Sequence, residues 1–423
     1  MQTKATLISV VALFLLVASV PAEEFHWINT ATALQYWDVN GSWSAPGFPR
    51  EIGDVAEFTD LDEYAGERRV ELNVNDYYTC SVIRCVADTN RYTVNINTYV
   101  ANGLFMEAES GNAAIILDDN FVSNTPSLAI AGHQLHILSP TDITVSNAAA
   151  RMDISAHMYG SASINKYGPG QVRATQTGDY AGTITVYEGQ LYCGNESNLY
   201  AATVVAKTGT TIQYDYYTLL GALPVPAHIV LEGGWLYNNG NTSDGKRFAN
   251  LTVNGEGYVT SKYYNTFFME STKGTGTLHI VARPVYVLGH VHPGFSIGEL
   301  TMRRDSGTLY VGTNGMPMTL HIETSPGGSD HLSFENLDAA STIVLSNINL
   351  VVEGSGTGLQ TNWVLTSNRM LAGSEFNNVS YIPGLFGEVI YDYANNRVGL
   401  LAAPEPAVTL LAACVLASLA RRR

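Results

Sequence analysis

Apolar and polar side chains alternate with a period of two through most of this chain, and this alternation limits its fold more than any other feature. In the segment RYTVNINTYV (91–100), Tyr92, Val94, Ile96 and Val100 fall on one face and mostly polar residues on the other. This pattern is typical of a β-strand that buries one face. We predict further strands at runs of the same kind, at 134–138, 142–146, 182–189, 277–281, 308–312, 319–323 and 341–353.

Turn-forming residues separate these runs. Gly, Asn, Asp and Ser fill most of the gaps, and the chain has 39 glycines, as tight turns require. Between the two terminal segments, no stretch of about twelve residues has helical spacing and caps, so we expect an all-β fold. Strand-turn units that resemble one another favour a right-handed parallel β-helix, or solenoid, in which each coil packs on its neighbours. β-Sandwich domains in series are the alternative.

The first 22 residues have the pattern of a secretory signal peptide. Lys4 is the only charged side chain, an apolar stretch covers 5–19, and small residues end the segment at Ala22. Signal peptidase recognises such small residues. We therefore expect export and cleavage after Ala22, with an uncleaved N-terminal membrane anchor as the alternative.

The last 20 residues, PEPAVTLLAACVLASLARRR (404–423), contain an uncharged apolar run at 407–420. As a helix this run is about 21 Å long, which is short for a bilayer core of about 30 Å. We expect one apolar helix there, inserted in the membrane only temporarily. Arg421, Arg422 and Arg423 would stay cytoplasmic and place the rest of the chain outside. The prolines would keep the preceding segment extended and accessible to an enzyme.

This tail resembles the PEP-CTERM sorting signal of exported bacterial proteins. The match consists of Pro404, Glu405 and Pro406, then the apolar run, then the three arginines. The resemblance implies capture at the inner membrane by an exosortase, processing near the Pro-Glu-Pro, and delivery to the cell surface or extracellular matrix. A simple C-terminal tail anchor is the alternative.

The body resembles autotransporter-type β-solenoid proteins in three segments. The opening segment 27–60 is similar to their first module through Trp43, Pro49, Gly53-Asp54, Ala56 and Phe58. The segment 166–195 resembles the autotransporter-associated β-strand repeat through Lys166, Gly168, Gly170, Tyr180, Gly182, Thr185 to Tyr187, Gly189 and Leu191. HPGFSIGELTM (292–302) resembles a turn and strand of the same family. We accordingly divide the chain into a signal peptide (1–22), an N-terminal β module (23–110), a solenoid body (111–403) and a sorting segment (404–423).

Charge and cysteine content limit the partners and the covalent framework. The net charge of the chain is −16, and without Lys4, Glu405 and the three terminal arginines it is −19. Such an acidic body argues against nucleic acid as a partner. Cys80 and Cys85 are close enough in sequence for a disulfide, but two reduced, buried cysteines on neighbouring strands would have the same pattern.

A few residues are candidates for chemistry. Asp118-Asp119 with Gly132-His133 are faintly similar to elements of pectin-hydrolysing β-helices, although the other elements are missing. The pair His290 and His292 would point to one side of a strand, as metal ligands should, but no third ligand follows at an obvious spacing, and two exposed loop histidines are expected instead. Asp330 and His331 could orient one another, but no nucleophile elbow accompanies them.

We therefore expect no metal, no cofactor and no catalytic site in this chain. The expected role is that of an exported bacterial surface or matrix protein, structural or adhesin-like, whose partners are signal peptidase, an exosortase-type enzyme and, as a candidate ligand, extracellular polysaccharide. Exposed tyrosines could stack on sugars, and of two adjacent strand tyrosines, such as Tyr77 and Tyr78, one should face the core. The rival hypothesis is a carbohydrate-active β-helix enzyme, a lyase or hydrolase.

Overall fold

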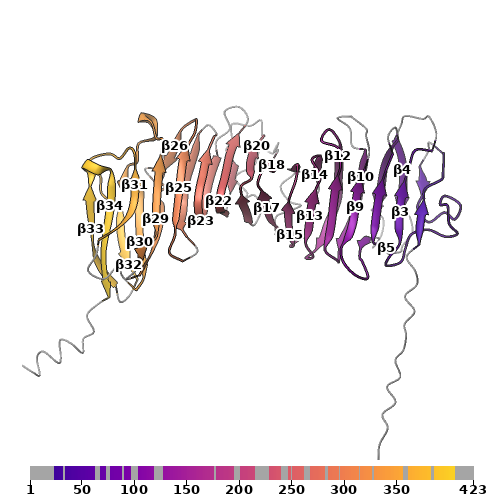
Figure 1. Ribbon diagram of the computed structural model, residues 1–423, viewed down its shortest axis with the longest axis horizontal. Helices are drawn as coiled ribbons and strands as arrows, with labels where there is room; N and C mark the ends of the chain where they lie inside the picture. The colour runs from indigo at the N-terminus through magenta and orange to yellow at the C-terminus, as the bar shows by residue number, and fades with distance from the viewer. Residues whose placement is uncertain are drawn as a thin grey trace, which may run out of the picture.

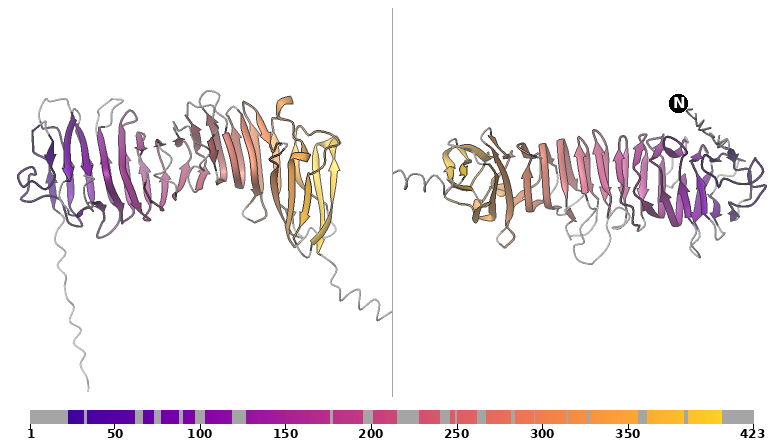
Figure 2. Two further views of the ribbon diagram at one scale, coloured as in Figure 1. Left: turned by 180° about the vertical axis from the view of Figure 1, so that it is seen from behind. Right: turned by 90° about the horizontal axis from the view of Figure 1, so that it is seen from below.

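The computed structural model is a long body whose β-strands run across its long axis, with the N-terminal strands at one end and the C-terminal strands at the other (Figure 1). Figure 2 shows the strands side by side along the body from two further directions. The structure describes residues 23–31, 34–61, 67–72, 77–87, 90–96, 103–118, 127–175, 178–194, 201–214, 228–239, 246–248, 250–261, 267–281, 284–294, 296–313, 315–325, 328–355, 361–382 and 385–404.

The strands follow one another along the chain as short segments joined by turns. In the first third they are β1 (Glu24–His26), β2 (Gln35–Tyr36), β3 (Val55–Phe58), β4 (Glu67–Leu72), β5 (Tyr77–Cys80), β6 (Val82–Cys85), β7 (Arg91–Ile96), β8 (Gly103–Met106), β9 (Ala113–Leu117), β10 (Leu128–Ile137), β11 (Thr141–Val145) and β12 (Arg151–Gly160). In the middle they are β13 (Ile164–Tyr167), β14 (Gln171–Ala174), β15 (Thr183–Val186), β16 (Gln190–Cys193), β17 (Thr203–Lys207), β18 (Thr211–Tyr214), β19 (His228–Glu232), β20 (Trp235–Asn238), β21 (Lys246–Phe248), β22 (Leu251–Ser261), β23 (Phe267–Ile280) and β24 (Val285–Pro293). In the last third they are β25 (Glu299–Arg304), β26 (Leu309–Val311), β27 (Met318–Ser325), β28 (Gly328–Ser329), β29 (His331–Glu335), β30 (Ile348–Gly354), β31 (Asn362–Ser367), β32 (Asn378–Tyr381), β33 (Leu385–Asp392) and β34 (Arg397–Pro404), with three 3₁₀ helices, η1 (Ala339–Ser341), η2 (Leu345–Asn347) and η3 (Tyr393–Asn395).

One parallel ladder runs through almost the whole body. It joins fifteen strands by fourteen parallel pairings, in the order β1, β3, β6, β9, β11, β13, β15, β17, β19, β22, β23, β24, β27, β30 and β32. A second parallel ladder runs beside it, from β2 through β10 and β20 to β31. Parallel stacking of successive coils is the arrangement of a β-solenoid, and it rules out a series of antiparallel sandwiches for the strands described.

The length of one coil varies along the body. In the middle, Gln171 pairs with Gln190, Gln190 with Thr211, and Thr211 with Trp235, so successive coils advance by 19, 21 and 24 residues. In the N-terminal part, the pairing of Tyr92 with Leu128 advances by 36 residues. These unequal loops explain why the sequence shows no fixed period.

The core lies between the ladders and follows the predicted alternation. In β7, Tyr92, Val94 and Ile96 are buried, as predicted, while Val100 lies outside the described residues. Because each strand stacks in register on the next coil, the buried side chains form rows along the axis. The row through β11, β15 and β17 includes Ile143, Val186 and Ala206. Each coil therefore buries its apolar face against its neighbours.

A glycine makes the corner in the long strand β10. The first half of β10 pairs with β7 and the second half with β8, with a register shift between Gly132 and Gln134 in its pairing with β12. Gly132 has φ +101°, and a Cβ atom there would lie 2.0 Å from the carbonyl oxygen of Ile96. Only glycine fits this close approach of two coils.

Both ends of the solenoid are closed by local structure. At the N-terminal end, the buried rings of Trp27, Trp37 and Trp43 pack on one another, with centroids 5.0 Å apart in the pairs Trp27–Trp43 and Trp37–Trp43. At the C-terminal end, β33 and β34 form an antiparallel pair, and β34 also pairs antiparallel with β31. Closed ends are required because a terminal coil has no further coil to cover it.

The structure differs from one predicted strand and does not describe the two terminal segments. The predicted strand at 341–353 is wrong in its first half, since η2 covers Leu345–Asn347 and β30 begins at Ile348. The predicted apolar helix at 407–420 lies outside the described residues, as does the signal peptide at 1–22. Within the described residues, no helix has the length and apolar character needed to cross a bilayer.

Candidate functional site

The residues predicted for sorting lie mostly beyond the described part of the chain. Pro404 is the last residue of β34, where its backbone position pairs with Leu385. Ala22, Glu405, Pro406, Arg421, Arg422 and Arg423 lie outside the described residues. The last described strand therefore ends at the first residue of the predicted sorting motif.

Three histidines meet on the outer face of the first ladder. His290 and His292 lie on β24 rather than in a loop, so the prediction of loop histidines is wrong. Val291 between them is fully buried, and the alternation turns both rings outward. Val291 pairs with Leu320 of β27, which brings His321 of the next coil beside His292.

The three rings are close enough for their nitrogen atoms to bind one metal ion. His290 Nδ1 lies 2.9 Å from His321 Nε2. The rings of His292 and His321 are stacked, with centroids 4.0 Å apart and an interplanar angle of 17°. One ring nitrogen from each histidine lies within 4.8 Å of the others.

A carboxylate from the following coil orients the third ring. Glu353 Oε1 of β30 lies 3.1 Å from His321 Nδ1, and the His321 side chain is only 18% exposed. A carboxylate accepts a hydrogen bond, so Nδ1 of His321 carries the proton and Nε2 presents its lone pair to the other two histidines. His290 Nδ1–H then donates to His321 Nε2.

The electrostatics favour a neutral ring for His292, which stacks on the central ring of His321. Burial lowers the pKa of His292 to about 4, and the neighbouring His321 adds to the effect. His292 is therefore uncharged at neutral pH, with a free lone pair on its ring.

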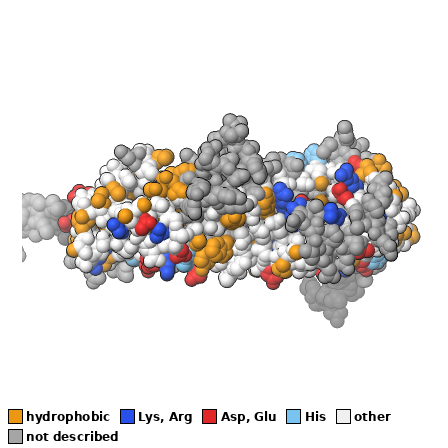
Figure 3. Space-filling model, turned by 90° about the horizontal axis from the view of Figure 1, so that it is seen from above, with side chains coloured by type: hydrophobic (Ala, Val, Ile, Leu, Met, Phe, Trp, Pro, Cys, Tyr) orange, Lys and Arg blue, Asp and Glu red, His pale blue; other side chains and the backbone are white. Residues whose placement is uncertain are grey.

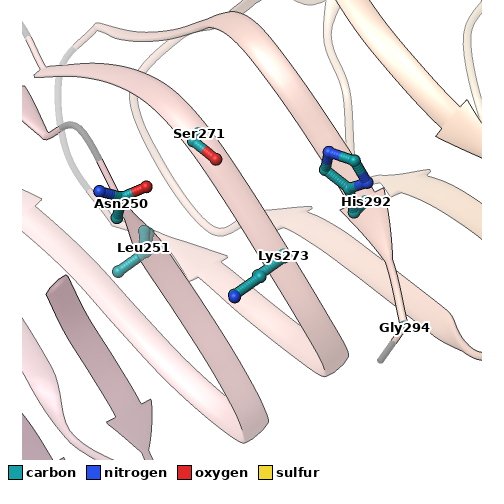
Figure 4. A pocket seen from close by; sticks show the side chains of 6 residues that line it. All are labelled: Asn250, Leu251, Ser271, Lys273, His292 and Gly294. Carbon is teal, nitrogen blue, oxygen red and sulfur yellow. The ribbon is translucent and has the colours of Figure 1, made fainter. Parts of the chain in front are cut away.

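A cavity of about 410 Å³ adjoins His292. It is lined by Asn250, Leu251, Ser271, Lys273, His292 and Gly294. Figure 4 shows Lys273 between Leu251 on one side and His292 on the other, with Ser271 further along the same strand. Lys273 pairs in register with His292 across β23 and β24. The ammonium group of Lys273 and the ring of His292, at the edge of the histidine group, therefore line the same cavity.

A second group of possible metal ligands lies at the N-terminal end. It consists of Glu24, His26 and Glu57, on β1 and β3. His26 Nδ1 lies 2.9 Å from Glu57 Oε1, and Arg84 Nη1 lies 3.3 Å from Glu57 Oε2. Because a guanidinium already shares the charge of Glu57, this group is the weaker candidate.

The residues that resemble pectin-hydrolysing β-helices do not form a catalytic group within the described part of the chain. Asp118 is exposed at the end of β9, and Asp119 lies outside the described residues. His133 lies at the corner of β10, with its ring centroid 5.6 Å from that of His157.

Asp330 and His331 do not orient one another, so that prediction is wrong. Asp330 accepts backbone hydrogen bonds from Gly298 and Glu323 at 2.8 and 2.9 Å, and burial raises its pKa to about 6. His331 bonds instead to Glu299 and Thr366. Asp330, between β28 and β29, therefore ties the backbone of β27 at Glu323 to Gly298, which directly precedes β25.

The residues that resemble the strand repeat have structural roles. Lys166 is buried, and its Nζ donates to the carbonyl oxygens of Tyr167, Gly168 and Glu188. The Tyr180 hydroxyl donates to Ala162 O at 2.7 Å, and a Cβ atom at Gly182 would lie 2.4 Å from that hydroxyl oxygen. These side chains hold turns against neighbouring coils.

The burial of the cysteines and of the adjacent tyrosines agrees with the alternation along the strands. Cys80, Cys85 and Cys193 are buried and form no disulfide, which answers the open question for Cys80 and Cys85 in favour of two reduced cysteines. Tyr78 is buried and Tyr77 is 55% exposed, as predicted for adjacent strand residues. Burial raises the pKa of the Cys193 thiol to about 12, so this thiol is unreactive at neutral pH.

Comparison with protein families, curated proteins and solved structures finds no match to this chain. The histidine group was only half visible in the sequence. His290 and His292 show the spacing of a pair, but His321 joins them through the stacking of coils, and coil length varies too much to foresee that contact.

Proposed function

We propose that this chain is an exported bacterial structural protein of the cell surface or extracellular matrix, with an adhesin-like or spacer role. The observation that carries the proposal is the unbroken parallel ladder of fourteen pairings from β1 to β32. With about 4.8 Å between neighbouring strands, this ladder alone extends about 67 Å. A solenoid closed at both ends is a rigid rod that can hold its surface away from a cell.

The proposed route follows the two ends of the sequence. Signal peptidase removes residues 1–22, the apolar segment 407–420 forms a temporary membrane helix, and an exosortase-type enzyme processes the chain near Pro404, Glu405 and Pro406. The coil is right-handed in this proposal, because crossovers between parallel strands of one sheet nearly always are.

Extracellular polysaccharide is the proposed partner of the displayed surface. On the face seen in Figure 3, Lys and Arg side chains lie among Asp and Glu side chains, with hydrophobic patches between them. Many outward rings are stacked on each other along the ladders, as in Tyr286–Tyr310 with centroids 4.6 Å apart. Their faces are therefore partly covered. Tyr77, at the start of β5, is 55% exposed and is the better contact for sugars, although its ring also packs edge-on with Phe105 at 5.1 Å.

Truncation of the tail tests the proposal. Because β34 ends at Pro404, a chain lacking residues 405–423 keeps every described strand. We expect this variant to fold and be exported but to be absent from the cell surface and matrix of a producing bacterium. A chain with 405–423 replaced by a Gly-Ser segment of equal length controls for length. Surface display of either variant at the level of the full chain would contradict the proposed sorting.

The same preparations distinguish the rival enzyme. Incubation with acidic polysaccharides should release no reducing ends and no unsaturated uronides. Release by the full chain that is lost in Asp118→Asn would favour a lyase or hydrolase over a structural role.

A further inference from the structure

We propose that His290, His292 and His321 form a binding site for a divalent transition-metal ion of the Zn²⁺ type. The proposal does not depend on the surface role above. It rests on three nitrogen donors that two successive coils bring within 4.8 Å of one another. Imidazole nitrogen is a preferred ligand of Zn²⁺, Cu²⁺ and Ni²⁺.

The distances require little movement. Two nitrogens on one tetrahedral Zn²⁺ ion, each with a bond of about 2.0–2.1 Å, lie about 3.3 Å apart. His290 Nδ1 and His321 Nε2 are 2.9 Å apart, so the ion can take the place of the proton between them once His290 carries its proton on Nε2. The stacked ring of His292 must turn about its Cβ–Cγ bond to direct its lone pair to the same point. The strands themselves can stay in place.

The surroundings supply what such a site needs beyond its ligands. Metal-bound histidines commonly donate their other ring N–H to a carboxylate, which fixes the tautomer. Glu353 does this for His321 at 3.1 Å. The fourth coordination position would face the cavity beside His292, where a water molecule or a small anion near Lys273 can complete the tetrahedron.

The positive charge of Lys273 should weaken metal binding, which gives a second, independent test of the site. Lys273 pairs with His292 in register and lines the same cavity. Its positive charge repels a bound cation. Removal of this charge should therefore tighten metal binding, an effect that a misfolded variant would not show.

The test is titration of the full chain, purified without a polyhistidine tag, with ZnCl₂ in a calorimeter, and with CoCl₂ followed by visible absorption. We expect one ion bound per chain at the histidines, and a loss of affinity of at least tenfold in each of His290→Gln, His292→Gln and His321→Gln. Glu353→Gln should weaken binding about tenfold, and Lys273→Gln should strengthen it severalfold.

His279→Gln is the matched control. His279 lies on β23 with a carboxylate partner, Asp305, at 2.8 Å, but it is not part of the histidine group. This variant should bind Zn²⁺ like the parent chain. Equal binding by the parent and the three ligand variants would overturn the proposal, and so would equal loss in His279→Gln. Circular dichroism of each variant confirms that the fold is intact.

Discussion

Lys166 occupies a core position that the alternation assigns to an apolar residue. It stacks between Ile143 of β11 and Val186 of β15 and is 1% exposed. Burial lowers its pKa to about 8, while the nearby charge of Glu188 acts in the opposite direction. Three backbone carbonyl groups accept hydrogen bonds from its Nζ, so the ammonium group satisfies turn carbonyls that an apolar side chain would leave unpaired.

We predict that Lys166 makes the free energy of unfolding rise with pH in the alkaline range. The pKa is lower in the folded chain than in the unfolded chain, where lysine titrates near 10.4. Between about pH 8 and pH 10.4 the unfolded chain binds more protons, so the free energy of unfolding rises with pH by up to about 3 kcal/mol. In Lys166→Met this rise should be missing. Melting temperatures measured across this pH range test the difference between the two chains.

Lys207 provides the control for that measurement. It lies on the solvent side of β17 and pairs with Glu232. Lys207→Met removes the same charge without removing a buried ammonium, so its pH profile should run parallel to that of the parent. Parallel profiles for the parent and Lys166→Met would contradict the assigned role of Lys166.

Single residues could be assigned to a face from the sequence but not to a partner. The alternation correctly predicted that one ring of the Tyr77–Tyr78 pair faces the core and the other solvent, because adjacent strand residues point to opposite faces, and the structure shows Tyr78 to be the buried one. It could not show that His321 meets His290 and His292, because that contact depends on the lengths of the loops between coils. Nor could it show that Asp330 accepts hydrogen bonds from the backbone N–H groups of Gly298 and Glu323.

At the scale of elements, the N-terminal aromatic group acts as the cap of the first coils. Trp37 Nε1 donates to Pro49 O at 2.8 Å, and Trp43 Nε1 donates to Trp37 O at 2.7 Å. Phe58 of β3 packs on the same rings. The segment between β1 and β3 is thereby folded over the open end of the core.

We predict that Trp43→Ala opens the N-terminal coils without affecting the distant ones. Truncation of a buried tryptophan costs about 3–5 kcal/mol, and in a solenoid such a loss acts mainly on the nearest neighbours. Hydrogen exchange followed by mass spectrometry should show faster exchange in β1, β3 and β4, with β27 and β30 unchanged.

Leu400→Ala is the matched variant at the other end. Leu400 is fully buried in β34, which pairs with β31 and β33. Faster exchange should then appear in β31, β33 and β34 and leave β3 protected. If both variants accelerate exchange evenly along the whole chain, a local loss of stability spreads through all coils, and the prediction is wrong.

Elements were predicted well where the period of two was clear. The predicted runs at 91–100, 142–146 and 319–323 correspond to β7, β11 and β27, although β11 ends at Val145 and residues 97–100 lie outside the described part of the chain. The run at 341–353 failed in its first half because two 3₁₀ turns interrupt the pattern, and the N–H of Leu345 in η2 donates to the distant Ser374 Oγ. Asp338 accepts a hydrogen bond from the backbone N–H of Ser341 and starts η1, and β30 begins only after η2.

In the molecule as a whole, parallel pairing connects the described strands into one continuous solenoid. β17 pairs with β19, and β18 with β20. These pairings join the strands on either side of residues 215–227, which lie outside the described part of the chain, so both ladders continue past that segment. The all-β class and the solenoid could be predicted because local strand patterns and similar repeats indicate them. The coil length could not, because it varies between neighbours.

We propose that this solenoid is processed at both ends and carried to the outside of a bacterial cell. The most direct measurement is the intact mass of the protein recovered from the surface or matrix of the producing cells. We predict a chain that begins at Glu23 and ends near Pro404 to Ala407. A protein that retains Arg421, Arg422 and Arg423 and is found only in the membrane fraction would contradict the claim.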